Sequence, residues 1–525
     1  MEEEYSVDDP THLLQEASDF ALYPGAQNDA SAKDFLDRFP LPVIINALQT
    51  KGDVPGLENT LVACLERIFN TKYGASFIPK YTLFVQVGLK ADSQIVRSLA
   101  CKTVTCLLEH FDSNTISPAR LIVDHDVYPL LLDCLLNGNE QVAAASMDAI
   151  KKLAGSPEGM DIIFPANNND ATLLGNVAAR CSSLGRVRVL ALIVKLFSIS
   201  NSVASTIYNS NLLNLFEAEI NNTNDTLVTL SALELLYELA EIQHGTEFLS
   251  RTIFLHLLCS IISTSTEPIL RLRAMMISGR LLSKENIYTF IDESSVKIVI
   301  SALDKILELS ESQDTDESES ALEALGQIGS SIEGAVLLLS SSPPAARHVI
   351  DAAFDRHGHG KQLSALHALG NIAGESRPEN KILLNGDAEE SLRRLMYITV
   401  SKSSKLTPSG LLVSVLQQDS EIHLAGYRVI TGMVARLWFL MEICSKQEII
   451  NIVTDASTET TKIGMEARYK CCQSIHKAFV SSSKLLNDPA LAGLAAKLQE
   501  AVRRGPYLAR EHVEARPVVV TADRF

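Results

Sequence analysis

The residues of this sequence best suited to metal chemistry are Asp355, His357 and His359, in the segment Asp355-Arg-His-Gly-His-Gly360. One carboxylate and two imidazoles are a ligand set that divalent transition metals accept. Two histidines separated by a single glycine in a loop more often bind nothing. We therefore predict no metal site here.

Motifs for covalent or cofactor chemistry are missing from the sequence. It has no HExxH, GxSxG or GxGxxG segment, and Lys402–Gly410 lacks the residue order that wraps backbone N–H groups around a phosphate. His244 and His423 stand at the ends of predicted helices, where capping or packing is the favoured role. We predict no catalytic residue and no cofactor, and hence a protein that is not an enzyme.

Cysteine usage indicates a reducing compartment. The nine cysteines are an odd number, most lie in apolar helical segments, and no CxxC pair occurs.

Met1-Glu-Glu-Glu4 lacks the apolar core of a secretory signal, and the longest apolar stretch, Ile253–Ser263, is short and contains His256. We expect neither a signal peptide nor a membrane span, and a location in the cytoplasm, with the nucleus as a second compartment.

A helix-like apolar pattern recurs about every 43 residues, a period typical of armadillo and HEAT repeats. Aligned on Asn371, ten segments share Leu, Ile, Val, Ala or Gly at the same flanking positions. The equivalent positions are Arg67, Cys106, Lys152, Lys195, Glu238, Arg280, Gln327, Asn371, Thr431 and Ser474. The sequence thus predicts an all-α fold, a right-handed α-solenoid of about ten armadillo/HEAT-like repeats.

A second marker supports the same register. A glycine followed by an apolar segment recurs at Gly159, Gly245 and Gly334, two repeats apart each time. This spacing is independent of the pattern around Asn371, and it predicts the same repeat length.

The predicted organisation has three parts. Residues 1–30 are expected to be weakly ordered, with a short helix around Thr11–Leu22. Residues 31–504 form the solenoid, with an insertion near 390–418 that we interpret as a loop, with an extra helix at Leu411–Leu416. Residues 505–525 follow a Gly-Pro stop as an extended tail.

The charge of the chain disfavours a nucleic-acid partner. A net charge of −17 and a pI near 5.2 offer no basic face for phosphates. The densest acidic run, 311–319, is interpreted as a solvated segment leading into a helix N-terminus, which favours carboxylates. A docking patch for a basic partner is the alternative.

In a stack of this kind the last helix of each repeat lines the inner, concave face, so the equivalent positions form a ladder along it. Glu234, Glu323 and His367 stand one turn earlier on three of these helices. The alternative is that such residues are only the solvated side of amphipathic helices. The candidate partner-binding residues are Lys152, Lys195, Glu234, Glu238, Arg280, Glu323, Gln327, His367 and Asn371.

One segment has a local resemblance to a known repeat. His367-Ala-Leu-Gly-Asn371-Ile-Ala-Gly374 resembles the armadillo repeat of nuclear-import adaptors, in which Trp and Asn four residues apart clamp an extended basic peptide. Here His367 takes the Trp position, and the other repeats have no Trp/Asn pair. The resemblance implies the fold, and it leaves a generic armadillo scaffold or a nuclear transport adaptor as the alternative function.

Five further segments occur in an order that spans the chain from about residue 60 onward. They are His244-Gly245 with Phe248-Leu249, Gly326-Gln-Ile-Gly329-Ser330 continuing to Glu333-Gly334, Glu421-Ile-His423-Leu-Ala425, Ala467-Arg-Tyr469, and Gly505-Pro506-Tyr507 followed by Pro517-Val518. Through these segments and their order, the chain resembles the family of the 26S proteasome non-ATPase regulatory subunit 5, an armadillo/HEAT-like assembly chaperone.

That resemblance implies a function and a partner. The family holds the C-terminal domain of one AAA-ATPase subunit of the proteasome base, among associated base subunits, and blocks premature docking on the core particle. It leaves before the mature complex forms. The resemblance implies no catalytic residues, and we expect a protein that is monomeric on its own, without nucleic-acid or membrane partners.

Overall fold

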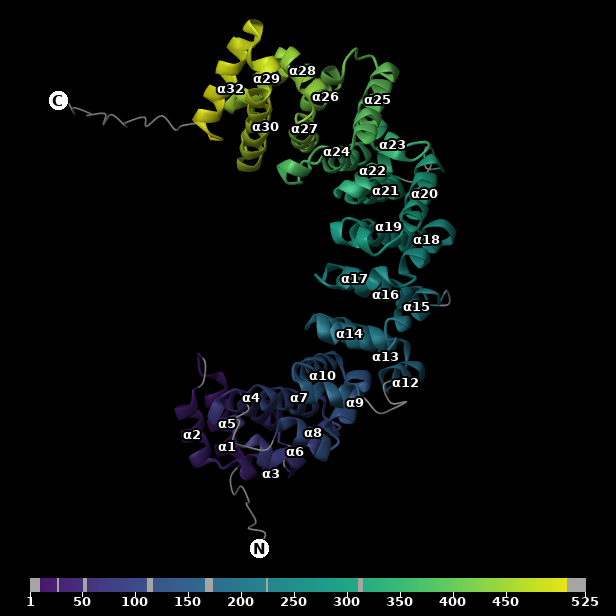
Figure 1. Ribbon diagram of the computed structural model, residues 1–525. Coiled ribbons are helices and arrows are strands. Elements are labelled where there is room, and N and C mark those ends of the chain that lie inside the picture. Colours follow the sequence, from purple (N-terminus) through teal and green to yellow (C-terminus); the bar gives the residue numbers. More distant parts are fainter. Residues whose placement is uncertain are drawn as a thin grey trace, which may run out of the picture. The chain divides into compact units, whose positions relative to one another are not determined.

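The computed structural model describes residues 10–25, 28–50, 54–110, 117–165, 173–222, 225–309 and 315–507. These residues form helices joined by short connections and contain no β-strand (Figure 1). They belong to two compact units, Met1–Leu249 and Ser250–Phe525. None of the helices in the described ranges has the length and apolarity needed to span a membrane. The predicted all-α class is confirmed.

The helices of the first unit are α1 Pro10–Leu22, α2 Asp29–Arg38, α3 Leu41–Thr50, α4 Leu57–Phe69, α5 Lys72–Ala75, α6 Thr82–Leu89, α7 Gln94–Glu109, α8 Pro118–Asp124, α9 Val127–Asn137, α10 Glu140–Leu153, α11 Pro157–Ile163, α12 Leu173–Arg180, α13 Ser183–Phe197, α14 Asn201–Asn209, α15 Asn214–Ile220, α16 Thr226–Glu241 and α17 Gly245–Ser250. Those of the second unit are α18 Phe254–Thr264, α19 Pro268–Leu282, α20 Glu293–Leu309, α21 Thr315–Ile328, α22 Ile332–Ser340, α23 Ala346–Ala353, α24 His359–Ala373, α25 Gly386–Lys402, α26 Pro408–Leu416, α27 Ser420–Met433, α28 Leu437–Ser445, α29 Gln447–Thr454, α30 Lys462–Ser481, α31 Ser483–Leu486 and α32 Ala492–Arg504. The 3-10 helices are η1 Ile78–Tyr81, η3 Glu285–Thr289, η4 Glu379–Lys381, η5 Ala456–Thr458 and η6 Pro489–Leu491.

The repeats share one plan, in which a first and a second helix precede a third helix that packs on the third helix of the next repeat, as in α22, α23 and α24. The third helices are α4, α7, α10, α13 and α16 in the first unit and α19, α21, α24, α27 and α30 in the second. Every equivalent position of the predicted register, from Arg67 on α4 to Ser474 on α30, lies on one of them. The predicted helical-repeat fold is therefore confirmed.

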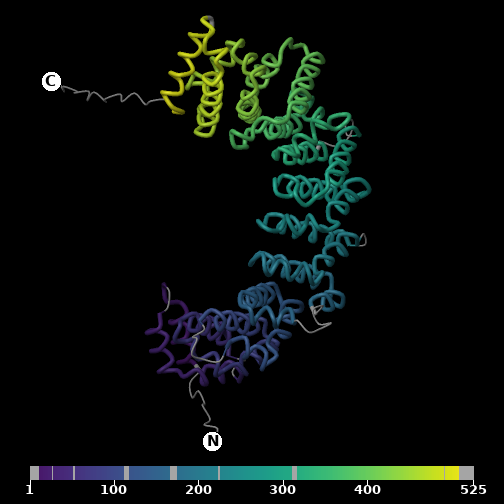
Figure 2. The backbone as a smooth tube through the Cα atoms, in the orientation of Figure 1, coloured from purple at the N-terminus to yellow at the C-terminus, as the bar shows by residue number. Residues whose placement is uncertain are grey.

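Within each unit, consecutive third helices pack against each other, and Figure 2 shows the successive coils stacked in chain order. The approach is closest in the second unit. A Cβ atom on Gly326 of α21 would lie 2.6 Å from the Cα of Ala368 on α24, and one on Gly279 of α19 would lie 2.9 Å from the Cα of Ala324 on α21. Glycine at these two positions lets the backbones of neighbouring third helices approach this closely.

The recurring glycine of the sequence has a steric cause. In each case it lies in the first turn of the helix that follows a third helix. A Cβ atom on Gly159, Gly245 or Gly334 would lie 1.8, 2.1 or 2.0 Å from a carbonyl oxygen near the end of that third helix. Ser156 caps the turn at Gly159, and Ser331 does so at Gly334. The recurring glycine therefore marks the position of the sharp turn into the next repeat.

Most of the insertion near 390–418 is helical, which corrects the loop interpretation except at the short connection 403–407 between α25 and α26. Its residues continue α25, which has 17 residues against 9 in each of the corresponding helices α22 and α28. The expected extra helix at Leu411–Leu416 is part of α26, the ordinary second helix of its repeat. The additional length of this repeat thus lies in a longer first helix and in the connection 374–385 that precedes it.

The two ends of the chain are described in part. Within 1–30, α1 packs on α4 and buries Leu13 and Ala17. At the other end α32 ends at Arg504, and Gly505 follows with φ +83°. Residues 1–9 and 508–525 lie outside the described ranges, and so do 311–314 of the acidic run. The rest of that run forms the first turn of α21, where Asp316 and Glu317 lie.

The close approach of the third helices is testable at Gly326. Gly326→Ala places a methyl group against Ala368, and overpacking of this kind costs about 1–3 kcal/mol of unfolding free energy. We expect a lower midpoint in urea unfolding followed by far-UV circular dichroism. The control is Gly493→Ala on α32, where a Cβ atom would meet nothing within 4 Å, so stability should be kept or raised by about 0.4–1 kcal/mol. Equal midpoints for the two variants would contradict the packing described.

Candidate functional site

The nine candidate partner-binding residues all lie on the sides of third helices that are not packed into the stack, and we call this surface the third-helix face. It is carried in the first unit by Lys152, Lys195, Glu234 and Glu238, and in the second by Arg280, Glu323, Gln327, His367 and Asn371. Lys152, Glu238 and Glu323 are exposed, and the other six are half-buried. Cys106, at the equivalent position on α7, is buried and offers no surface.

In the first unit the third-helix face is crossed by ion pairs, each of which joins a lysine to an acid on the preceding third helix. The pairs are Lys102 with Glu66 at 2.7 Å, Lys152 with Glu109 at 3.1 Å, and Lys195 with Asp148 at 3.0 Å. Both partners of each pair keep contact with solvent. Exposed pairs of this kind add at most about 1 kcal/mol to stability. They can therefore be exchanged for pairs with another protein at little cost to the fold.

A polar groove follows these pairs along α4, α7, α10 and the end of α13. One stretch of about 460 Å³ is lined by Lys102 and Glu109, among others, and a neighbouring stretch of about 820 Å³ by Lys151 and Lys152. Glu109 and Asp148 line both stretches. The groove thus presents charges of both signs, which suits a polar protein surface better than an apolar small molecule.

On α16 the face becomes acidic. Glu234 and Glu238 lie one turn apart, with Glu238 exposed and Glu234 half-buried. The buried side of the same helix carries Leu236 and Leu239. Substitutions of the two glutamates therefore change the charge of the face without disturbing the core.

In the second unit, Arg428 of α27 forms hydrogen bonds with His367 and Asn371, the two polar residues of the segment that resembles an adaptor repeat. Its Nη1 donates to Nδ1 of His367 at 2.7 Å, and its Nη2 donates to Oδ1 of Asn371 at 3.1 Å. It also forms an ion pair with Glu375 at 3.1 Å, and Lys470 of α30 pairs with the same carboxylate. Side chains from three repeats thus form one network on this part of the third-helix face.

The network shifts the pKa values of its members. Burial lowers the pKa of His367, and the positive charge of Arg428 adds to this effect. Burial would raise the pKa of Glu375, but the hydrogen bonds and charges of Lys470 and Arg428 outweigh it and hold that pKa below its usual value. At neutral pH the network therefore contains a neutral imidazole that accepts from arginine, and an ionised carboxylate.

The remaining candidates lie earlier in the same unit. Gln327 of α21 donates from Nε2 to Oε1 of Glu323 at 3.3 Å, one turn away on the same helix. Arg280 lies half-buried on α19. These residues make the face polar at α19 and α21 as well.

The residues considered for a metal do not converge. His359 pairs with Asp419 at 3.2 Å, and Asp355 accepts from the backbone N–H of His357 at 3.0 Å. His357 and His359 are both exposed. With these contacts, the segment forms the loop that leads into α24.

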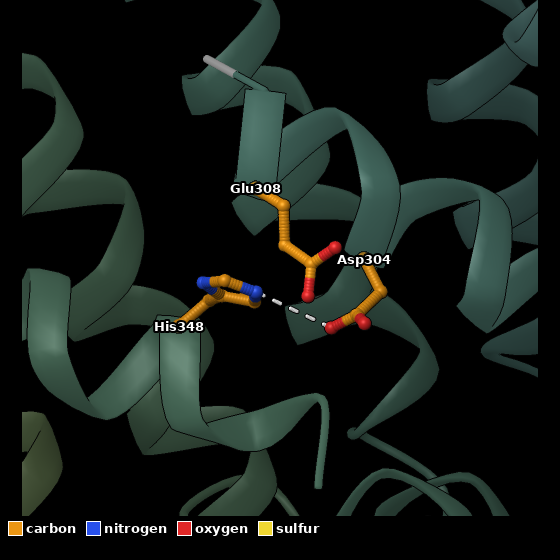
Figure 3. A group of neighbouring side chains, drawn as sticks. All are labelled: Asp304, Glu308 and His348. Atoms are coloured by element: carbon orange, nitrogen blue, oxygen red, sulfur yellow. Dashed lines mark ion pairs between the residues drawn. The ribbon is translucent and has the colours of Figure 1, made fainter. Parts of the chain in front are cut away.

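The structure brings together a different group, which the sequence did not single out. Figure 3 shows Asp304 and Glu308 of α20 facing His348 of α23, with His348 Nε2 3.3 Å from Asp304 Oδ1. Arg347 donates to Asp304 at 2.9 Å and to Glu308 at 2.8 Å, so its positive charge compensates part of the charge of the two acids. Burial and the charge of Arg347 lower the pKa of His348. A cation would have to displace the guanidinium, so we interpret this group as a structural ion-pair cluster.

His244 and His423 have packing roles. The ring of His244 stacks on Phe197 and places Nε2 2.8 Å from the Phe197 carbonyl oxygen. The ring of His423 packs against Tyr427, and Nε2 lies 3.5 Å from Glu459 Oε1. The contacts of His244 with Phe197 and of His423 with Glu459 join neighbouring repeats, in line with the role favoured from the sequence.

Sequence reasoning missed Arg428, Glu375 and the acids that pair with the lysines of the first unit. A usable signal was present, because opposite charges stand at nearby positions of successive repeats, as with Asp148 and Lys195. Comparing charges between repeats, as well as within one helix, would have found that pair.

Comparisons with known proteins agree on one family. The sequence model of a family described as "Proteasome non-ATPase 26S subunit" matches residues 57–524. The 26S proteasome non-ATPase regulatory subunit 5 of Homo sapiens is 21% identical over 470 residues, which are 88% of this chain and 86% of that protein. The subunit of the same name from Bos taurus is 20% identical over 455 residues, covering 85% and 84%.

Solved structures with a similar chain include an engineered protein, with a TM-score of 0.43 and 15% identity over 82% of this chain and 98% of that one. Another belongs to work on the interaction between cadherin and beta-catenin, with a TM-score of 0.41 and 11% identity over 88% and 90% of the two chains.

The buried imidazole of His367 predicts an acid-sensitive fold. Since its folded-state pKa lies below the ordinary value of 6.5, the unfolded chain binds the proton first. The unfolding free energy should therefore fall as the pH drops below about 6.5. His348 and His423 act in the same direction. His367→Gln keeps an acceptor for Arg428 and should make this dependence less steep, measured as urea midpoints across the pH range.

The matched control is His256→Gln, at an exposed histidine on α18 of the same unit. It should retain the pH dependence of the unmodified chain. If His367→Gln also retained it, the burial and pairing of His367 would not be coupled to folding.

Proposed function

Because the chain belongs to the proteasome non-ATPase 26S subunit family, we propose that it is a non-enzymatic assembly chaperone of the base of the 26S proteasome regulatory particle. It binds the C-terminal domain of one AAA-ATPase subunit through the third-helix face, which the sequence predicts to be concave. It leaves before the mature complex forms. It acts as a monomer in the cytoplasm, with the nucleus as a second compartment.

The observation that carries the proposal is the extent of the family match. It runs over residues 57–524 and thus includes every repeat that contributes to the third-helix face. The identity to these relatives is low, near one residue in five, but the similarity covers more than 80% of each chain. Proteasome-related binding by a repeat scaffold fits both facts.

The character of the surface supports release as well as binding. A chaperone that departs needs a polar, wet interface, because large apolar interfaces belong to permanent complexes and their dissociation is slow. The groove of the first unit is lined by both charges, and its ion pairs are exposed. Charged side chains of a client can pair with the residues of these ion pairs on binding, and the internal pairs form again when the client leaves.

Long-range electrostatics favour encounter with a basic client. The net charge of −17 attracts a positive surface, and Glu234 with Glu238 places part of that charge on α16. Such attraction mainly raises the association rate, and added salt weakens it. The acidic part of the face is therefore the first place to test.

The nuclear transport adaptor is disfavoured by the position of Arg428. In the segment that resembles an adaptor repeat, the acceptor atoms of His367 and Asn371 both receive hydrogen bonds from this arginine. A basic peptide would have to displace it. Since no other repeat carries a Trp/Asn pair, an adaptor reading has no second binding point.

Charge reversal on α16 tests the function. Glu234→Lys with Glu238→Lys should weaken capture of proteasomal ATPase subunits without unfolding the chain, because both residues contact solvent and the apolar side of α16 is unchanged. The immobilised protein is exposed to cell extract at moderate salt, and the captured proteins are quantified by mass spectrometry. A loss of about tenfold is expected if both charges contact the client.

The control is Glu158→Lys with Asp161→Lys on α11, which makes the same change in charge at two exposed residues of a first helix. It should retain capture. Equal capture by both double variants would remove Glu234 and Glu238 from the interface. Absence of proteasomal ATPase subunits from the capture by the unmodified chain would overturn the chaperone proposal itself.

A further inference from the structure

The connection 374–385, which follows α24, makes ion pairs that skip a repeat. Lys381 of η4 pairs at 2.6 Å with Glu285 of η3, which follows α19. In the other direction along the stack, Glu379 pairs with Lys477 of α30. Since the third helices α21 and α27 come in between, each of these pairs spans two interfaces between repeats.

A link across two interfaces restricts the shape of the stack. In helical-repeat proteins each repeat normally contacts its neighbours alone, and the curvature is the sum of small rotations at the interfaces. A pair that closes over two interfaces couples two of those rotations, because a rotation at either interface moves the paired atoms apart. We call the connection 374–385 the brace.

The first half of the brace is held firmly. Arg377, only 7% exposed, donates to the carbonyl oxygen of Gly329 just after α21 at 2.6 Å, and to that of Ile372 on α24 at 3.1 Å. The carboxylate of Glu375, whose side chain is 9% exposed, pairs with Arg428 of α27 at 3.1 Å. Buried charged groups are costly to leave without their partners, so this half stays in place.

The second half, which we call the tip, is held by exposed pairs. The side chains of Glu379 and Lys477 are 72% and 64% exposed, and those of Lys381 and Glu285 are 41% and 47% exposed. The hydrogen bond with Glu285 raises the pKa of Lys381, and Glu333 adds a further negative charge near it. An exposed pair favours its closed state by at most about fivefold, so two independent pairs favour a closed tip by at most about 25-fold.

The tip also bounds part of the third-helix face. A depression of about 450 Å³ is lined by Glu379 and Ile382 of the brace, by Thr431 of α27, and by Ser474 and Lys477 of α30. Thr431 and Ser474 are equivalent positions of the predicted register. The position of the tip therefore determines how much of the face is open at the last two repeats.

We propose that the brace is a conformational device of the second unit, with a fixed first half and a tip that opens and closes. The closed tip fixes the rotations between α19 and α30, and with them the curvature of the third-helix face. The open tip lets these repeats rotate and leaves Lys477 and Glu285 to the charged groups of a bound protein. Because closure is weakly favoured, such a protein, or added salt, shifts the population toward the open state.

The device is built from contacts within the chain and does not depend on which protein is the client. It can therefore fail while the chaperone proposal holds, and the reverse.

Zero-length cross-linking tests the closed tip in the full-length protein. A water-soluble carbodiimide joins a lysine to a carboxylate when the two groups are in contact. We expect linked peptides that join Lys381 to Glu285 and Glu379 to Lys477, identified by mass spectrometry. Their yield should fall in ~1 M salt, where the Debye length is about 3 Å. Absence of both links at low salt would contradict a closed tip.

Hydrogen exchange tests whether the tip couples the repeats. Lys381→Glu with Lys477→Glu should speed amide exchange in η3 and at the end of α30 by about two- to fivefold, as well as in the tip itself, because the rotations of the stack are released. In ~1 M salt the unmodified protein should exchange as fast as the variant, since the pairs are then screened. Exchange is followed by mass spectrometry of peptides from the full-length protein.

Two controls separate pairing from total charge. Lys381→Glu combined with Glu285→Lys exchanges the charges of one pair, and it should restore the slow exchange in η3 that Lys381→Glu alone loses. Lys297→Glu with Lys402→Glu makes the same change in charge as the test variant, at exposed lysines that pair within α20 and between α25 and α23. This variant should exchange like the unmodified protein in η3 and α30.

Two further results would overturn the proposal. One is faster exchange confined to the tip, with η3 and α30 unchanged, because the pairs would then hold the tip without coupling the repeats. The other is a failure of the charge exchange to restore η3, which would show that the pair of Lys381 with Glu285 does not control the brace.

Discussion

The close approach of neighbouring third helices is the constraint on which the rest of the second unit depends. Gly326 faces Ala368 without room for a side chain, and a Cβ atom on Gly329, just after α21, would lie 2.4 Å from the side chain of Ile372 near the end of α24, so the ends of the two helices also lie close together. Carbonyl groups at those ends are buried and need donors. Arg377, only 7% exposed, donates to the carbonyl oxygens of Gly329 at 2.6 Å and Ile372 at 3.1 Å. Burial and the nearby charge of Arg436 lower the pKa of Arg377 to about 10, so it remains charged at neutral pH.

The ion pairs of the chain are of two kinds: some are buried inside the tightly packed stack, and others are exposed on the third-helix face. The side chain of Arg436 is 2% exposed and pairs with Glu389, and removing one partner of such a buried pair costs about 3–5 kcal/mol. Lys152 and Glu109 are each more than 40% exposed, and their pair contributes at most about 1 kcal/mol. A buried pair therefore cannot lose one partner without loss of stability, because the other charge is left buried and uncompensated. The pairs on the third-helix face can change partners without loss of the fold.

The sequence was sufficient for the repeat length and for the helix that carries each candidate residue, because the period of an amphipathic helix is a local property. It was not sufficient for the contacts of those residues. Arg428 reaches Asn371 from the next repeat, and this depends on how far one repeat rotates on another, which no single helix encodes. The loop interpretation near 390–418 was right only for the connection 403–407, for a related reason. A break in the period shows that residues were added, but α25 is helical because its own apolar side meets α22 and α23.

Binding on the third-helix face must disrupt ion pairs that the fold already makes. A client on the third-helix face replaces internal pairs such as that of Lys195 with Asp148, so the net electrostatic gain is small, and shape and desolvation decide the affinity. A buried pair such as Arg436 with Glu389 is not available for such an exchange, since removing one partner leaves the other charge buried and uncompensated. Binding and release on the third-helix face therefore involve only the exposed pairs.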